Sequence, residues 1–89
     1  MSWQLLWSKR AARELAKMDR MTQRVIIAKM RRIVEESCDP RASGKALSGN
    51  LREYWRYRVG DWRVICEIHD SEATVTAIEV GHRRDVYRR

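Results

Sequence analysis

The chain is 89 residues long, and 19 Lys and Arg against 12 Asp and Glu give it a formal net charge of +7. A chain of this length buries about two thirds of the surface that it exposes when unfolded, so it supports one small core and no second one. We therefore expect a single domain over residues 1–89. Because 44% of the residues are apolar, the composition argues against an intrinsically disordered chain.

The longest wholly apolar run, residues 25–28, is far shorter than the run of about 20 residues that crosses a bilayer. No apolar stretch near the N-terminus has the length of a secretion signal, so we expect the cytoplasm as the compartment and no membrane partner. Cys38 and Cys66 are the only cysteines, and neither lies in a C-x-x-C pair or near a His at zinc-finger spacing. This pattern argues against a disulfide scaffold and a metal site, and we expect no cofactor.

Arginine accounts for 15 of the 19 basic residues. Its planar guanidinium binds two phosphate oxygens at once, so the basic excess favours a polyanion as the binding partner. Residues 1–51 hold 11 basic and 5 acidic groups, whereas residues 52–89 hold 8 and 7. Phosphate chemistry in the second part therefore depends on where individual arginines are placed.

The N-terminal half predicts one strand and two helices. Residues 3–7 are aromatic and aliphatic and form the expected first strand, which ends at Ser8, a residue able to cap the next helix. Apolar residues at three- and four-residue spacing predict a helix over residues 9–18 and a longer one that begins after Asp19 or Thr22 and extends to Ser37. Pro40 cannot continue that helix, and residues 38–50 form the one long loop.

The C-terminal half alternates in the two-residue period of half-buried strands. The predicted strands cover residues 52–59, 62–68 and 73–80, with turns at Gly60–Asp61 and Asp70–Ser71 and an end to the last strand at Gly81. Residues 82–89 form a short tail of one or two helical turns. The expected fold is α+β, of order β-α-α-β-β-β with a short C-terminal helical tail, and both helices pack on one face of a small antiparallel sheet.

The same alternation places Arg56, Arg58 and Arg63 on the sheet face turned away from the core, with Arg63 beside Arg56 or Arg58 across the hairpin. Because like charges repel, such a cluster favours an anionic ligand. The alternative is a solvated face whose arginines pair with nearby acids. The tail adds His82, Arg83, Arg84 and Tyr87, and the acids available for pairing are Asp61, Glu67, Glu79 and Asp85.

No nucleotide-loop, dinucleotide, zinc-protease or hydrolase-elbow motif occurs in the chain. RNA cleavage needs none of them, because the 2′-hydroxyl can attack the adjacent phosphate when cations surround the transition state and protons are moved. Arginine stays protonated and cannot act as base, which leaves His82 or Tyr87, although each also fits an ordinary surface or packing role. Trp55, Tyr57 and Trp62 fall on the core side, so we interpret them as packing residues.

Three segments resemble the RelE branch of the RelE/ParE toxin superfamily: KALSGNL at 45–51, YWRYRVGDWRVI at 54–65 and VGHRRDVY at 80–87. The middle segment is shared across the superfamily, whereas the last is more selective, because the gyrase-directed ParE branch generally lacks such a basic-and-Tyr set. The resemblance implies a RelE-like fold and a type II toxin that cleaves mRNA in the ribosomal A site. It also implies a RelB-like antitoxin that holds the toxin inactive in a hetero-oligomer.

The alternatives are a ParE-like toxin that inhibits DNA gyrase without nuclease activity and an inert relative that only binds RNA or its antitoxin. If the chain is the mRNA-cleaving toxin, its basic helices could meet ribosomal RNA, although antitoxin acids or solvent explain them equally well. The helical cations concerned are Arg10, Arg13, Lys17, Arg20, Arg24, Lys29, Arg31 and Arg32.

By position, Arg63 resembles the arginine that contacts the scissile phosphate, and Arg83 or Arg84 resembles the C-terminal arginine that stabilises the transition state. Tyr87 resembles the tyrosine that stacks on or activates the nucleotide, and His82 matches members that use histidine. Arg56 falls where some members have a catalytic lysine, and Tyr54 falls where others have a second one. The catalytic residues implied are Arg63, His82, Arg83, Arg84 and Tyr87, and the RNA-binding residues are Lys45, Arg52, Arg56 and Arg58.

Overall fold

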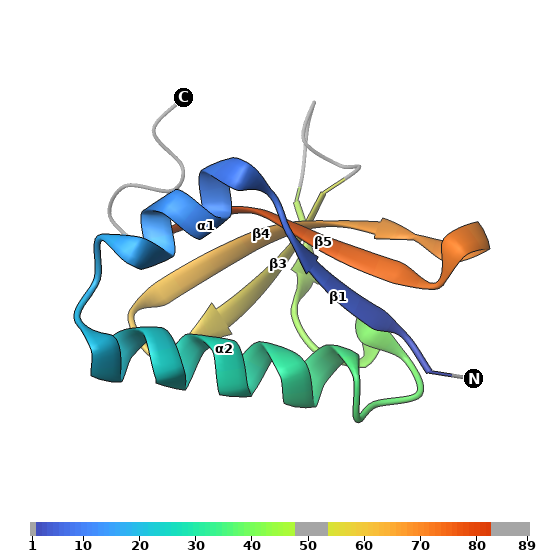
Figure 1. Ribbon diagram of the computed structural model, residues 1–89. Coiled ribbons are helices and arrows are strands. Elements are labelled where there is room, and N and C mark those ends of the chain that lie inside the picture. Colours follow the sequence, from blue (N-terminus) through green and yellow to red (C-terminus); the bar gives the residue numbers. More distant parts are fainter. Residues whose placement is uncertain (1, 48–53, 83–89) are drawn as a thin grey trace.

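Five strands form one sheet in the order β1-β5-β4-β3-β2, with two helices beside it (Figure 1). The structure is a computed structural model that describes residues 2–47 and 54–82. The elements are β1 (Gln4–Trp7), α1 (Lys9–Ala16), α2 (Arg20–Val34), β2 (Lys45–Ala46), β3 (Tyr54–Val59), β4 (Trp62–His69) and β5 (Thr74–His82). The predicted α+β class and the order of the elements are confirmed, and the expected C-terminal helical tail lies outside the described residues.

The sheet is mixed and not wholly antiparallel as expected. Strands β2 to β5 pair antiparallel, but β1 pairs parallel to β5, with Leu5 opposite Val75. The physical reason is the connection between the two strands. From β1 the chain passes through both helices to the far edge of the sheet and returns strand by strand to β5, so no hairpin turn joins β1 to β5 and the two strands can pair parallel.

Each helix begins where a side chain can accept the first free amides. The hydroxyl oxygen of Ser8 accepts from the amide of Ala11 at 3.0 Å, and a carboxylate oxygen of Asp19 accepts from the amide of Thr22 at the same distance. The Thr22 hydroxyl also donates to Asp19 at 2.6 Å, and these hydrogen bonds lower the pKa of the Asp19 carboxyl. Of the two starts expected for the second helix, Asp19 is therefore the cap.

The core lies between the helices and one face of the sheet, called here the inner face. Strands β3, β4 and β5 contribute apolar residues at alternate positions, and α1 and α2 contribute residues spaced by three or four. Helix α2 contacts both β1 and β3, so it spans this face (Figure 1). The core residues are Leu5, Ala11, Leu15, Ile26, Met30, Val34, Tyr57, Val59, Val64, Cys66, Val75, Ala77 and Val80. The packing role predicted for Trp55, Tyr57 and Trp62 is confirmed.

The predicted long loop contains a short strand, β2, that the sequence pattern did not indicate. Before it, residues Pro40–Ala42 form a 3₁₀ turn anchored from the inner face, because the fully buried Tyr57 donates its hydroxyl to the Pro40 carbonyl at 2.6 Å. Trp55 donates its indole N–H to the carbonyl of Ser43 at 2.7 Å. These two bonds bring the chain to the edge of β3, where β2 pairs with it.

A type II′ turn joins β3 to β4 at the predicted position. Gly60 has φ +60° whereas Asp61 has a negative φ, and glycine is the residue that this turn requires at its first central position. Across the turn Val59 pairs with Trp62, which sets the register of every residue in the hairpin. Within the described residues, neither helix has the length and apolar character needed to cross a membrane.

Replacing Gly44 with Ala is expected to lower the free energy of unfolding by about 2–5 kcal/mol. Gly44 has φ +80°, and a Cβ would lie 2.6 Å from Trp55 Nε1 and against the carbonyl oxygen of Arg56. Gly60→Ala is the matched control, because φ there is +60° but no atom lies within 4 Å of the added carbon. The control should cost only about 1–2 kcal/mol in urea denaturation, and equal losses would contradict the close packing at Gly44.

Candidate functional site

A row of cations crosses the sheet face opposite the helices, called here the outer face. The register places Lys45 opposite Arg56, and Arg58 opposite Arg63, and cross-strand partners project from the same face. Arg56 and Arg58 alternate with the core residues of β3, and Arg63 alternates with those of β4. The structure thus brings together four of the predicted site residues, and we call them the outer-face cations.

Arg58 and Arg63 form the closest cross-strand pair of this row. Val59 and Trp62 flank the two-residue turn and are a hydrogen-bonded pair, so Arg58 and Arg63 are a non-hydrogen-bonded pair, whose side chains are nearer to one another. Arg58 is exposed, whereas Arg63 is 8% exposed. Two like charges in this position repel, and burial of one of them weakens the screening by water.

Strand β5 contains a bulge that changes which residues reach the outer face. Cys66 pairs with Ala77 and Ile65 pairs with Glu79, so Ile78 is an extra residue between the two pairs. Without it, Glu79 would continue the core side begun by Val75 and Ala77. The extra residue turns Glu79 to the outer face, where it is 7% exposed and lies diagonal to Arg63.

Gly81 does not end the last strand, as expected, but lies within it opposite Arg63. Because glycine has no side chain, it leaves space on the outer face for the side chain of Arg63 across from it. The strand extends to His82, so this residue belongs to the sheet and not to a tail.

The structure separates His82 from the arginines with which it was grouped. His82 pairs with Trp62, and the two rings make an edge-to-face contact with centroids 5.6 Å apart and planes at 82°. Trp62 packs against the core, so His82 projects from the inner side of the sheet and Arg63 from the outer side. The sequence predicted His82 in a tail beyond the last strand, next to the arginines. It lies instead within β5 on the inner side, because the Ile78 bulge changes the parity of the strand.

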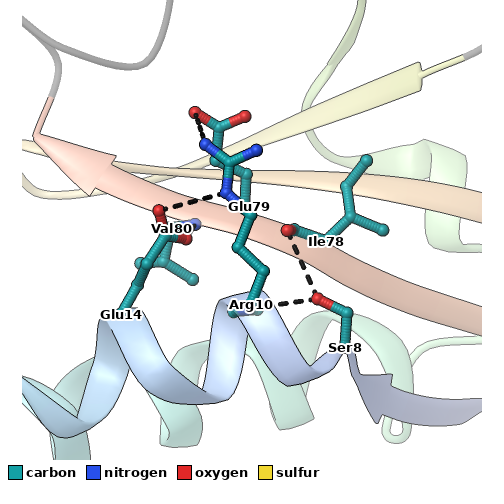
Figure 2. A network of polar contacts seen from close by, with 7 residues as sticks. Ser8, Arg10, Glu14, Ile78, Glu79 and Val80 are labelled. Carbon is teal, nitrogen blue, oxygen red and sulfur yellow. Dashed lines mark hydrogen bonds and ion pairs between the residues drawn. The ribbon is translucent and has the colours of Figure 1, made fainter.

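Helix α1 continues the hydrogen bonding of β5 beyond the end of β1 (Figure 2). The Ser8 hydroxyl donates to the Ile78 carbonyl at 3.3 Å, and the Glu14 carboxylate accepts from the Val80 amide at 2.7 Å. Arg10 extends from the same helix past the strand, and its guanidinium lies 3.5 Å from both Glu14 and Glu79. Glu79 is thus held by a charge from α1 as well as placed by the bulge.

Two other described acids, Glu67 and Asp70, lie away from the outer-face cations. Glu67 shares the outer face but lies at the other end of β4, with a carboxylate oxygen 3.3 Å from Nε2 of His69. Asp70, beyond the end of β4, accepts two hydrogen bonds from Arg41 at 2.8 and 2.9 Å, and this guanidinium lowers the pKa of the Asp70 carboxyl. Glu67 and Asp70 therefore have their partners at the other end of β4 and beyond it, and Asp85 lies outside the described residues.

Few groups on the inner side can take part in proton transfer. Burial raises the pKa of the Cys66 thiol and of the Tyr57 hydroxyl well above their usual values, so both stay protonated at neutral pH. In the part of the chain that the structure describes, no three His, Cys, Asp or Glu side chains gather closely enough to hold a metal ion. At the site, the described residues therefore provide a set of permanent positive charges, the outer-face cations. The predicted residues Arg52, Arg83, Arg84 and Tyr87 lie outside the described residues.

Solved structures with the same arrangement of strands and helices are toxins of toxin–antitoxin pairs. The toxin–antitoxin complex RelBE2 from Mycobacterium tuberculosis has a TM-score of 0.79 and 24% identity over 96% of this chain and 95% of that chain. A mutant of the Escherichia coli toxin RelE in the free state has a TM-score of 0.75, with 20% identity over 97% and 88% of the two chains. The archaeal RelE–RelB complex from Pyrococcus horikoshii has a TM-score of 0.71, with 21% identity over 97% and 100%. At these identities the likeness establishes the fold, which is that of the RelE toxins.

The sequence itself assigns the family. Residues 5–87 match the family model described as the ParE toxin of type II toxin–antitoxin systems, parDE, and the chain belongs to this family. It is also 38% identical over 53 residues to Toxin RelG of Mycobacterium tuberculosis, over 60% of this chain and 61% of that protein. The match thus spans about three fifths of the length of that relative. The predicted membership of the RelE/ParE superfamily is confirmed, and the protein is a type II toxin of that superfamily.

Replacing Arg58 with Glu is expected to raise the free energy of unfolding by about 0.2–1 kcal/mol, because it exchanges a like-charge pair with Arg63 for an opposite-charge pair. Arg58→Gln removes the charge alone and should give an intermediate gain. Both gains should shrink as salt is added to the urea denaturation, since salt screens exposed charges. A loss of stability in both variants would show that the pair is not strained.

Proposed function

We propose that this toxin is a ribosome-dependent mRNA endoribonuclease that cleaves mRNA in the ribosomal A site and so inhibits translation. The observation that carries the proposal is the cross-strand pair of Arg58 and Arg63, extended by Arg56 and Lys45 along one face of the sheet. Like charges placed opposite one another on neighbouring strands repel. A face of this kind suits the phosphates of an RNA backbone, which would offset the repulsion.

The chemistry that such a face supports is transfer within the RNA itself. The 2′-oxygen loses its proton and forms a bond to the adjacent phosphorus, and the bond to the 5′-oxygen of the next nucleotide breaks. The products are a 2′,3′-cyclic phosphate and a 5′-hydroxyl, which takes up a proton. Negative charge grows on the phosphoryl oxygens in the transition state, and a guanidinium held within hydrogen-bond reach of them stabilises that charge.

Arg63 is the group best suited to this role. Because it is 8% exposed, its charge acts in surroundings that screen less than bulk water does. Its backbone is fixed between β3 and β5, so a phosphate bound there meets a positioned guanidinium and not a mobile one. Glu79, which lies diagonal to Arg63, gives the outer-face cations one acidic neighbour.

A general base must come from another residue, because arginine stays protonated. Of the two groups expected from the sequence, His82 projects from the inner side of the sheet together with Trp62. This position does not favour His82 as the group that removes a proton at Arg63. We therefore assign the base to Tyr87, with Arg83 or Arg84 as the second transition-state arginine.

The expected partners follow from the same proposal. The mRNA is the substrate and ribosomal RNA is the surface against which the toxin binds. A RelB-like antitoxin would hold it inactive, and the support is that the M. tuberculosis and P. horikoshii structures of this fold are toxin–antitoxin complexes.

Inhibition of DNA gyrase without nuclease activity is the second candidate, because the matching family model is described as the ParE toxin. The two functions differ in what they do to nucleic acid. A nuclease leaves new 5′ ends in mRNA, whereas a gyrase inhibitor leaves mRNA intact and blocks supercoiling.

Arg63→Ala is expected to lower the rate of mRNA cleavage on the order of 10²-fold or more, because it removes a transition-state charge. The assay incubates a defined mRNA with and without programmed ribosomes and maps the 5′ ends of the products. Arg63→Lys retains the charge without the planar fork and should restore only part of the rate. Arg41→Ala is the matched control, because Arg41 is exposed and binds Asp70, away from the outer-face cations.

Circular dichroism establishes that each variant is folded before its rate is compared. Undiminished cleavage by Arg63→Ala would remove Arg63 from the mechanism. Intact mRNA with the parent protein in the presence of ribosomes, together with inhibited supercoiling by gyrase, would replace the nuclease proposal with the second candidate.

A further inference from the structure

A pocket of about 330 Å³ lies at the edge of the sheet, between α2 and β3. Lys29 and Ile33 line it from α2, Lys45 lines it from β2, and Arg56, Tyr57 and Arg58 line it from β3. Two cations of this pocket, Arg56 and Arg58, are also outer-face cations. The pocket is therefore continuous with the outer face and turns around the edge of β3 toward the helix.

The pocket exists because β2 is short. Pairing between β2 and β3 ends with Lys45 opposite Arg56, and the preceding Gly44, with φ +80°, packs closely against the backbone of Arg56 without continuing the ladder. In an antiparallel ladder the backbone groups of every second residue point to the same side, so the amide of Arg58 points to the same edge as that of Arg56. Both a backbone donor and cationic side chains thus lie at this edge.

The charge of the pocket is one-sided. Among the described residues that line it, four are cationic and none is Asp or Glu. Within residues 2–47 and 54–82, Lys29, Lys45 and Arg58 make no ion pair, whereas Arg10 and Arg41 do. Cations that converge without acids raise the local potential and attract an anion.

The size and the position of the pocket indicate which anion. Small-molecule sites have volumes of about 300–1,000 Å³, so this one admits a phosphate with its sugar and little more. Arg56 and Arg58 are two residues apart on a strand, about 7 Å, and one track of cations leads from Arg63 over them to Lys45 and Lys29. A chain of repeated phosphates matches such a track better than the scattered carboxylates of a protein surface do.

We propose that this pocket binds a backbone phosphate of single-stranded RNA next to the phosphate held at Arg63, with Lys29 and Lys45 as its contacts. The proposal rests on RNA being the substrate of the outer face. It assigns a specific role in RNA binding to Lys29, which the sequence indicated only as one of several basic residues on the helices. The sequence pattern held no signal for this role, because Lys29 and Lys45 come together only through the packing of α2 beside the edge of β3.

The test is RNA binding by the double variant Lys29→Ala/Lys45→Ala of the full chain. The probe is a fluorescein-labelled RNA of 12 nucleotides with 2′-O-methyl groups, which cannot be cleaved by its own 2′-oxygens, and binding is followed by fluorescence anisotropy over a range of KCl concentrations. The matched control is Lys9→Ala/Lys17→Ala, which removes the same charge from exposed positions at the two ends of α1.

The pocket variant should bind the RNA at least about 10-fold more weakly than the control at equal salt. Each contact to a single strand contributes about 0.7 to the slope of log K against log salt, so the slope should fall by about 1.4 in the pocket variant. Equal losses in both variants would overturn the proposal, since net charge alone would then explain them. Unchanged binding by the pocket variant would overturn it as well.

A labelled peptide of 12 glutamates separates RNA from an acidic protein partner. The proposal is overturned if the pocket variant loses the peptide but retains the RNA. Because the probe RNA is not cleavable, weakened binding by the pocket variant supports the phosphate site even where the cleavage assay fails. Conversely, mRNA cleavage by the parent protein together with unchanged RNA binding by the pocket variant would refute the phosphate site in the pocket and leave the proposed nuclease function standing.

Discussion

The extra residue in β5 is the constraint on which the two faces of the sheet depend. Strand β5 lies between β1 and β4, and its first part must present Val75 and Ala77 to the helices. Strict alternation from there would bury the carboxylate of Glu79 in the apolar core, which is costly for an unpaired charge. Ile78 shifts the alternation by one residue, so that Val80 enters the core and Glu79 turns outward.

The same shift also determines which contacts helix α1 makes with β5. Beyond the bulge no strand of the described residues lies beside the edge of β5. Ser8, the N-cap of α1, and Glu14 within α1 supply the hydrogen bonds that a strand would otherwise make. Arg10 then reaches Glu79 from the same helix. One backbone irregularity therefore links the position of α1, the location of the acid and the separation of His82 from Arg63.

Cations gather on the outer face and at the edge of β3, where Lys45, Arg56, Arg58 and Arg63 lie on neighbouring strands. Elsewhere on the chain, Arg41 binds Asp70. The buried end of the row lies at Arg63, and the open end lies in the pocket between α2 and β3. An RNA strand bound along this track would meet the least screened charge at one phosphate and more exposed charges at its neighbours.

The sequence by itself determined the order of the helices and the longer strands, the start of the first helix at Ser8, the hairpin at Gly60 and the row of arginines, because each depends on local periodicity, capping or turn chemistry. It also placed Trp55, Tyr57 and Trp62 in the core, since alternation within one strand is a local property. Only the tertiary structure decided the parallel pairing of β1 with β5, the short strand β2, the outward turn of Glu79 and the inward turn of His82. These features depend on contacts between segments far apart in the chain. The strand edges pair with distant segments, burial of the Glu79 carboxylate in the core would be costly, and the residue pattern does not indicate where β5 forms its bulge. The pocket beside Lys29 also depends on the tertiary structure, because the local sequence of α2 does not indicate which strand edge the helix packs beside.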